Sequence, residues 1–433
     1  MATTAPRTWG IRWAAALCLS AALVRAAGAG EHWTSFRGPG DQGHADATNL
    51  PTRWSERQNV AWKTPLAGKA WSSPVIWGDR IWLTNAFEDG RELFVLCVDK
   101  RSGKVLLDKR LHSVAEPQFC IPFNSYASPS PVIEPGRVYV SFGSPYNACL
   151  DSATGQVIWQ RTDFVCNHFR GAGSSPMIFQ DLLILHFDGS DRQYLAAMDK
   201  RTGKTVWTTD RTMDFQDIDP RTGRPAMDGD FRKAFSTPIL VDVQGKPLLV
   251  SLGSMALYGY EPLTGKELWR VESVGSHSGS CRPVAGHGLV FSAMGYTAGV
   301  WAVRPDGRGL VTDSHVLWKY PSQSARRPSF LLVGDWLFLV DSAGVAACLE
   351  AKTGKELWKE RLGGNYSASP IHAAGKIYFF DETGRSTVIE AAPQYRLIAV
   401  NRLDAGCMAS PAVSGNALYL RTKTALYRIE EQP

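Results

Sequence analysis

Three short patterns in this chain contain residues that could do chemistry, and each lacks the context which that chemistry requires. Residues 38–43 read Gly-x-Gly-x-x-Gly, the spacing of a dinucleotide-binding loop, but they follow Phe36-Arg37 instead of an apolar strand, and no helical segment comes next. Residues 275–279 imitate a nucleophile elbow, with His277 in the place of the serine. Aspartates crowd the segment 214–230 in a spacing that fits no calcium loop. We therefore interpret all three segments as loops.

A motif of the form Asp-x-x-Thr-Gly-Lys-x-x-Trp recurs along the chain and predicts the elements that position its functional residues. The Asp-x-x-Thr-Gly part predicts a hairpin turn, because its side chains cap the turn and its glycine tolerates positive φ. A tryptophan that recurs once per unit is best used to pack neighbouring units together. On this basis we assign as repeat residues Trp62, Asp99, Asp151, Trp159, Asp199, Trp207, Trp269, Trp318 and Trp358.

Each unit also begins with Ser-Pro or a similar pair ahead of an apolar strand, and we call these positions the blade starts. They are Ser73-Pro74, Ser130-Pro131, Ser175-Pro176, Thr237-Pro238, Arg282-Pro283, Ser329-Phe330, Ser369-Pro370 and Ser410-Pro411. Two strands after each start and two around each turn make a unit of four antiparallel strands. Units of about 40–45 residues with four strands are typical of β-propeller blades. The sequence thus predicts an all-β, eight-bladed propeller.

The spacing at the two ends of the chain predicts how the ring closes. Trp62 stands 12 positions before Pro74, as Trp358 stands 12 before Pro370. Segment 59–63 is therefore an outer strand with no blade in front of it, and the last unit lacks an outer strand. We predict that these two halves pair and close the ring, since closure protects exposed sheet edges. Residues 31–433 then form a single domain, with 31–58 as an N-terminal extension.

In a propeller, the loops into the innermost strands and the turns between the second and third strands share one face, around a central funnel. Polar and aromatic side chains that converge on such a funnel are the default hypothesis for a ligand site. Capping of open strand ends is the alternative role for the same residues. The candidates are Trp71, Asn124, His168, Arg170, Asp188, Lys233, Arg282, Arg327, Asp341, Asn365 and Asp381.

The first 30 residues differ from the rest and predict export. Arg7 and Arg12 precede an apolar run from Trp13 to Val24, and small residues follow, as in a cleaved secretory signal peptide. The run is too short for a membrane anchor. Bulky Leu17 ahead of the cysteine argues against a lipoprotein. We expect a secreted or periplasmic bacterial protein, and its scattered basic residues predict no nucleic-acid partner.

The cysteines outside this segment include one pair that could form a disulfide. Cys120 and Cys166 lie in neighbouring loops, each about ten residues ahead of a blade start. An oxidising compartment would permit a bond between them.

On the repeated Asp-x-x-Thr-Gly-Lys-x-x-Trp motif, the sequence from about Trp33 to Glu430 resembles the PQQ-repeat, or quinoprotein-like, propeller family. The resemblance implies the eight-bladed fold and two functional types. Quinoprotein dehydrogenases bind pyrroloquinoline quinone (PQQ) and calcium in the funnel and oxidise alcohols or sugars. Outer-membrane assembly scaffolds such as BamB have no cofactor and work through protein contacts.

Departures from the dehydrogenase pattern favour the scaffold type. The chain has no Cys-Cys pair, which family dehydrogenases typically place against the quinone, and it has no haem domain. We expect a monomeric scaffold or ligand-binding module that engages another exported or envelope protein, with no cofactor, metal, catalytic residue or transmembrane segment. The alternative is a PQQ- and calcium-dependent oxidoreductase. There, Asp188, Asp341 or Asp381 would be the base or a metal ligand, and His168 and Arg170 would lie near the quinone carboxylates.

Overall fold

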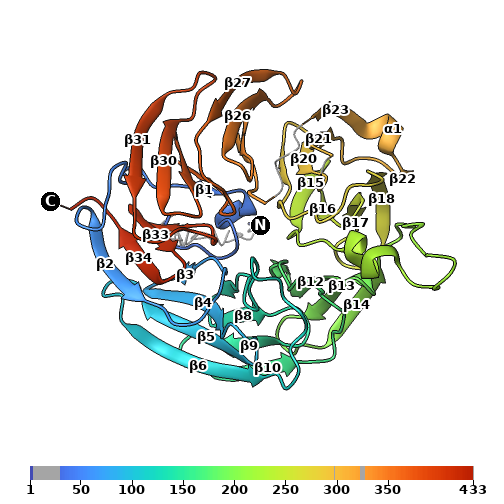
Figure 1. Ribbon diagram of the computed structural model, residues 1–433, viewed down its shortest axis with the longest axis horizontal. Helices are drawn as coiled ribbons and strands as arrows, with labels where there is room; N and C mark the ends of the chain where they lie inside the picture. The colour runs from blue at the N-terminus through green and yellow to red at the C-terminus, as the bar shows by residue number, and fades with distance from the viewer. Residues whose placement is uncertain (3–29, 297, 322–326, 433) are drawn as a thin grey trace.

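The computed structural model describes residues 1–2, 30–296, 298–321 and 327–432. Nearly all of the predicted signal peptide lies outside these ranges and stays a prediction. The described chain forms eight sheets of antiparallel strands arranged as blades around a central axis (Figure 1). The prediction of an all-β, eight-bladed propeller is confirmed.

Strands are given for each blade from the axis outwards. Blade 1 contains β3 (Val75–Trp77), β4 (Arg80–Ala86), β5 (Glu92–Asp99) and β6 (Val105–Ser113). Blade 2 contains β7 (Val132–Glu134), β8 (Arg137–Ser141), β9 (Asn147–Asp151) and β10 (Val157–Arg161). Blade 3 contains β11 (Met177–Phe179), β12 (Leu182–Asp188), β13 (Gln193–Asp199) and β14 (Thr205–Asp210). Blade 4 contains β15 (Ile239–Val243), β16 (Lys246–Leu252), β17 (Ala256–Tyr260) and β18 (Glu267–Glu272).

The second half of the ring repeats this order. Blade 5 contains β19 (Val284–Gly286), β20 (Leu289–Ala293), β21 (Val300–Val303) and β23 (Val316–Tyr320). Blade 6 contains β24 (Leu331–Val333), β25 (Trp336–Val340), β26 (Val345–Glu350) and β27 (Glu356–Arg361). Blade 7 contains β28 (Ile371–Ala373), β29 (Lys376–Phe380), β30 (Arg385–Glu390) and β31 (Leu397–Arg402). Blade 8 contains β32 (Ala412–Ser414), β33 (Ala417–Arg421), β34 (Ala425–Ile429) and β2 (Val60–Pro65).

A few short elements lie outside this scheme. The 3-10 helices η1 (Pro39–Asp41) and η2 (Ala226–Arg232) and the α-helix α1 (Thr312–His315) interrupt the loops. Strand β22 (Gly309–Leu310) adds to the outer edge of blade 4, and β1 (His44–Ala45) adds to the inner edge of blade 7. None of the helices in the described ranges has the length and apolar character needed to span a bilayer.

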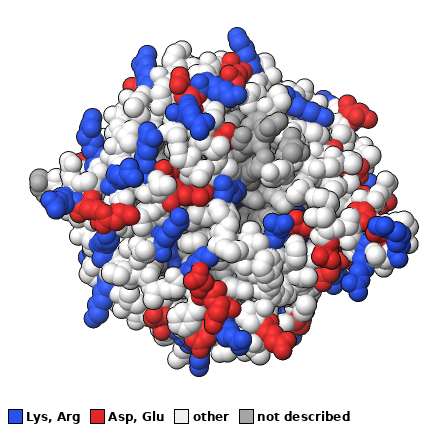
Figure 2. All heavy atoms as spheres, viewed as in Figure 1, with Lys and Arg blue, Asp and Glu red and all other residues white. Residues whose placement is uncertain are grey.

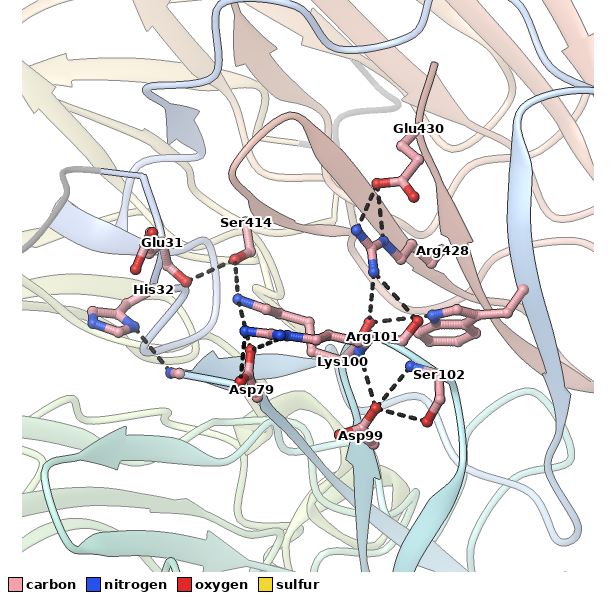
Figure 3. Close-up of polar contacts among 12 residues, drawn as sticks. Glu31, His32, Asp79, Asp99, Lys100, Arg101, Ser102, Ser414, Arg428 and Glu430 are labelled. Carbon is pink, nitrogen blue, oxygen red and sulfur yellow. Dashed lines mark hydrogen bonds and ion pairs between the residues drawn. The ribbon is translucent and has the colours of Figure 1, made fainter. Parts of the chain in front are cut away.

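The ring closes as the spacing of Trp62 predicts. Strand β2 runs antiparallel to β34, with Lys63 opposite Tyr427, so the blue N-terminal strand lies beside the red C-terminal strand in Figure 1. Polar contacts also join the closing blade to blade 1 (Figure 3). Arg428 of β34 donates to the carbonyls of Lys100 and Arg101, which lie in the turn between β5 and β6. The closing blade is thereby bonded to blade 1.

Adjacent blades are joined by the tryptophan of one unit and the turn of the next. Trp159 Nε1 donates to the carbonyl of Lys200 over 2.9 Å, and a Cβ placed on Gly203 would lie 2.7 Å from Trp159 Cδ2. Gly203 has φ of +71°, a left-handed conformation that favours glycine. Trp318 and Gly354 repeat the arrangement between blades 5 and 6. The glycine of the motif thus has two roles: it adopts the left-handed conformation of its own turn, and its lack of a side chain leaves room for the indole of the neighbouring blade.

The N-terminal extension closes the central channel at the end opposite the funnel. Trp33 forms a bridge with Ile76 of blade 1, and Thr34 accepts a hydrogen bond from the N–H of Ile133 in blade 2. After η1, strand β1 pairs in parallel with β28 of blade 7. The segment 33–45 therefore crosses the ring between blades that lie on different sides of it.

Candidate functional site

The funnel contains a cavity of about 650 Å³ that opens on the face of the blade-start loops. Phe36, from the N-terminal extension, is part of its lining, together with residues from loops all around the ring. Aromatic side chains in the lining include Trp71, Phe123, Phe235 and Tyr296. The size and the mixture of aromatic and polar groups suit a ligand or an inserted peptide segment.

A circle of hydroxyl groups surrounds the narrow end of this cavity. At each step of the circle the backbone N–H of one blade start donates to the hydroxyl of the next, as Ser73 N–H does to Ser130 Oγ over 2.8 Å. Seven such bonds are present, and the residues that accept them are Ser73, Ser130, Ser175, Thr237, Ser329, Ser369 and Ser410. We call these seven residues the hydroxyl ring. Each accepts a bond from a neighbouring blade, so the ring also ties the blades together.

Arg282 stands at the blade 5 position of this circle, where a guanidinium replaces the hydroxyl. The side chain is buried and ties the ring to the N-terminal extension. Its Nε donates to the carbonyl of Pro238 over 2.9 Å, and it donates to the carbonyl of Phe36 and pairs with Asp41. Burial lowers the pKa of Arg282, while Asp41 opposes that shift.

The funnel face exposes large apolar side chains on its loops, and Phe123 and Tyr296 among them line the cavity. Phe119 is 58% exposed, Phe123 42% and Tyr296 42%. The complete set on this face is Phe87, Phe119, Phe123, Val165, Ile218, Met227, Val274 and Tyr296, which we call the apolar arc. Its members lie on loops of blades 1 to 5; among the described residues, the loops of blades 6 to 8 add none. Figure 2 shows charged side chains of both signs scattered over the ring instead of one single-sign patch.

Four of the sequence candidates line the cavity. Trp71 Nε1 donates to the carbonyl of Phe123 over 3.0 Å, and Asn124 Nδ2 donates to the carbonyls of Arg170 and Ala172. The other two hold carboxylates. Arg170 forms two 2.6 Å bonds with Asp230, and Arg327 pairs with Glu382 at 3.2 Å.

The candidates of blades 2 and 3 lie in a buried network beside the cavity instead of in its lining. Asp188 forms a bidentate pair with Arg211 at 2.6 and 2.7 Å, and its carbonyl accepts from Lys233 Nζ at 3.3 Å. Burial lowers the pKa of Lys233 to about 8. His168 Nε2 accepts from Ser144 N–H over 2.9 Å, and burial lowers the pKa of its imidazole to about 3.

The candidates of blades 6 and 7 cap their own turns. Asp341 Oδ1 accepts from the N–H groups of Ala343 and Val345, both at 2.8–2.9 Å. Asp381 Oδ1 accepts in the same way from two N–H groups of its turn. Asn365 is exposed, and its carbonyl accepts from Glu382 N–H. The structure therefore does not bring Asp188, Asp341 and Asp381 together.

The two cysteines of the predicted disulfide are free thiols in the structure. Cys166 is buried, and its Sγ lies 3.6 Å from His168 Nε2. Cys120 Sγ lies 3.8 Å from the carbonyl of Arg170. Both side chains border the loop that carries His168 and Arg170, on the same side of the funnel mouth.

The acidic and metal-ligating side chains and a second cavity help to delimit the site. Within the described ranges, no group of three or more His, Cys, Asp and Glu side chains is arranged to hold a metal ion. A second polar cavity, of about 400 Å³, lies at the closing seam and is lined by residues that include Lys100, Arg428 and Glu430. Figure 3 shows its charges already engaged: Arg428 with Glu430 and Lys100 with Ser414. The funnel is therefore the better candidate.

Sequence reasoning missed the hydroxyl ring, Phe36 and Asp230. The serines were visible as blade starts, but their hydroxyls had been given no role beyond starting a strand. Asp230 was included in the acidic loop 214–230, since its partner Arg170 lies 60 positions away. Phe36 belongs to an extension whose path through the channel has no local sequence signal.

The family described as outer membrane protein assembly factor BamB matches residues 52–241 and 253–405, which is most of the chain. The chain belongs to this family.

Individual relatives of this BamB-family propeller are distant. BamB of Legionella pneumophila (strain Paris) is 24% identical over 207 residues, which are 45% of this chain and 50% of that protein, so the match spans only half of the relative. The crystal structure of BamB from Moraxella catarrhalis has a TM-score of 0.57 at 12% identity, with 86% of this chain and 99% of that one covered. Quinohemoprotein alcohol dehydrogenase from Comamonas testosteroni has a TM-score of 0.64 at 12% identity, with 93% and 81% covered. At such identities these two structures establish the fold alone.

Proposed function

We propose that this protein is an exported scaffold propeller that binds another protein of the cell envelope through the funnel face. The observation that carries the proposal is the apolar arc on the funnel face, of which Phe123 and Tyr296 also line the cavity of about 650 Å³. Clustered apolar exposure of this kind is typical of protein-interaction surfaces. Membership in the BamB family, whose description is an outer-membrane assembly factor, supports an envelope partner.

The arc and the cavity suit a partner segment better than a flat docking surface. Phe119 contacts Phe169 with ring centroids 5.9 Å apart, and Arg327 lies over the Phe123 ring at 4.4 Å. Aromatic and arginine side chains in such arrangements supply much of the binding energy of interfaces. A segment of the partner could rest on these rings and extend into the cavity.

The lining of the funnel does not fit PQQ with calcium. Calcium takes six to eight oxygen ligands, often from several carboxylates, whereas Asp230 of the lining is occupied by Arg170. The acids proposed for the oxidoreductase are engaged elsewhere: Asp188 by Arg211, and Asp341 and Asp381 by their own turns. The donor set therefore favours the scaffold over the oxidoreductase.

Affinity purification with matched variants tests the scaffold. A double change, Phe119→Asp with Phe123→Asp, places charge on the arc. The control, Leu263→Asp, alters an equally exposed side chain on the opposite face, in the turn after β17. We expect a defined exported protein to co-purify with the wild type and the control and to be lost with the double variant. Binding must then be reproduced with the two purified proteins. Co-purification of the partner with the double variant would show that the apolar arc does not bind it.

Calorimetry of the purified protein with PQQ and calcium tests the alternative function. The scaffold predicts no saturable heat when PQQ is added with or without calcium. Tight binding that depends on calcium would instead favour the oxidoreductase.

A further inference from the structure

The hydroxyl ring carries more bonding capacity than the blades use. Each of its oxygens accepts one N–H from the neighbouring blade, as Ser130 Oγ accepts Ser73 N–H and Ser175 Oγ accepts Ser130 N–H. A hydroxyl has in addition one O–H to donate. In the described part of the chain, no acceptor is found for the ring hydroxyl protons of Ser73, Ser130, Ser175, Thr237, Ser369 and Ser410, which line the cavity.

Four arginines lie near this ring of donors, and one of them has no carboxylate partner among the described residues. Three arginines of the funnel and its narrow end have carboxylate partners: Arg170 with Asp230, Arg282 with Asp41 and Arg327 with Glu382. Arg37 lies next to Phe36 in the chain and is fully buried, and it forms no salt bridge with a described carboxylate. Its Nη2 donates to the carbonyls of Gln42 and Phe330, while Nε and Nη1 have no described partner.

The charge of Arg37 is incompletely compensated. Its pKa is lowered to about 9, first by burial and then by the neighbouring Arg282, against the opposing effects of Cys281 and Asp41. A buried cation without a paired anion costs free energy, and a bound anion near the narrow end would reduce that cost. Arg37 lies close to the hydroxyl ring, because it donates to the carbonyl of Phe330, the residue that directly follows Ser329 in the sequence.

From these two features we propose that the narrow end of the funnel binds a carboxylate, with the hydroxyl ring as its donors and Arg37 as the source of positive potential. A carboxylate accepts several hydrogen bonds at once and prefers donors in a water-poor, positive site. This inference rests on the proposed function, in that the aromatic walls above the ring would hold the chain that ends in this group. Its source is either the end of a peptide or a free organic acid.

Threonine and valine at the ring give a matched pair of variants. Thr237 shows that a β-branched residue fits the circle and keeps its hydroxyl. Thr at positions 130 and 175 (Ser130→Thr with Ser175→Thr) retains both donors, and Val at the same positions (Ser130→Val with Ser175→Val) has the same shape without them. Thermal unfolding establishes whether each variant is folded before binding is measured.

Calorimetry with three probes tests the proposal: succinate, a pentapeptide of alternating leucine and serine as the free acid, and its C-terminal amide. We expect the wild type and the Thr variant to bind the free acid about tenfold tighter than the amide, and the Val variant to lose that preference. Binding of succinate that is lost in the Val variant, without any preference for the peptide acid, would assign the site to free acids.

Three results would overturn the proposal: no binding of either carboxylate probe to the wild type, equal affinity for acid and amide without succinate binding, or unchanged binding in the Val variant. If the Val variant does not fold, the acid and amide comparison on the wild type decides alone. The proposed scaffold is tested separately, because Phe119→Asp should leave succinate binding unchanged while it weakens capture of the envelope partner.

Discussion

Trp159 of blade 2 lies against Gly203 of blade 3, and its indole N–H donates to the carbonyl of Lys200 over 2.9 Å. The glycine and the tryptophan of the repeat motif are therefore in contact across the boundary between consecutive blades. Each motif depends on its neighbour, which explains why the pattern is retained in blades with no common role at the funnel.

Replacement of Gly203 by alanine should destabilise the protein more than the same change at Gly136. Both have positive φ, +71° and +81°, so alanine costs each about 1–2 kcal/mol. A Cβ on Gly136 would enter open space, but one on Gly203 would displace Trp159, which adds about 1–3 kcal/mol. Chemical denaturation of the two variants measures the difference, and equal losses would show that the indole contact contributes little.

Replacement of Arg282 by methionine should loosen the N-terminal extension. The change removes the bonds to Phe36 and Pro238 and leaves Asp41 without its ion-pair partner. Hydrogen exchange in segment 33–45 should become faster, while the outer strands keep wild-type protection. Asp41→Asn is the matched control, since it removes the ion pair but leaves the carbonyl contacts. Unchanged exchange in the Arg282 variant would mean that β1 and Trp33 hold the segment by themselves.

Acid should destabilise the fold in part through His168. Burial lowers the pKa of its imidazole from 6.5 to about 3, so below pH 6.5 the unfolded chain binds a proton that the folded chain does not. The stability contributed by neutral His168 is complete above pH 6.5 and is lost as the pH falls towards 3, by about 1.4 kcal/mol per pH unit.

Glutamine at this position supplies the comparison, because its carbonyl can accept from Ser144 N–H without titrating. Between pH 3 and 7, the unfolding free energy of the wild type should fall more steeply with decreasing pH than that of His168→Gln. A residual slope is expected from His44, whose pKa burial lowers to about 4. Parallel curves would show that His168 is not the group responsible.

The sequence was sufficient for the architecture because propeller blades repeat their signals locally. Turn acids, glycines and tryptophans recur at a fixed spacing, and the position of Trp62 predicted the pairing of β2 with β34. Blade 5 has Arg304-Pro-Asp306-Gly307 in place of the Thr-Gly turn, yet its blade start at Arg282-Pro283 identified it, and the structure contains it.

The funnel was harder to predict, because its residues come from distant loops. Trp71, Asn124, Arg170 and Arg327 were found from the topology alone. Asp188 and Lys233 were placed on the correct face, but buried pairing directs them into a network beside the cavity. The hydroxyl ring needed the interatomic distances between blades, which a single blade's sequence does not contain.

Photo-cross-linking in intact cells tests the funnel-face scaffold most directly. A photoreactive phenylalanine analogue would replace Phe123 in one strain and Leu263, on the opposite face, in another. If the funnel face is the docking surface, one exported protein, identified by mass spectrometry, should be cross-linked at position 123 and not at position 263. Cross-linking of that protein at position 263 alone, or equally at both positions, would contradict the claim that the funnel face is the docking surface.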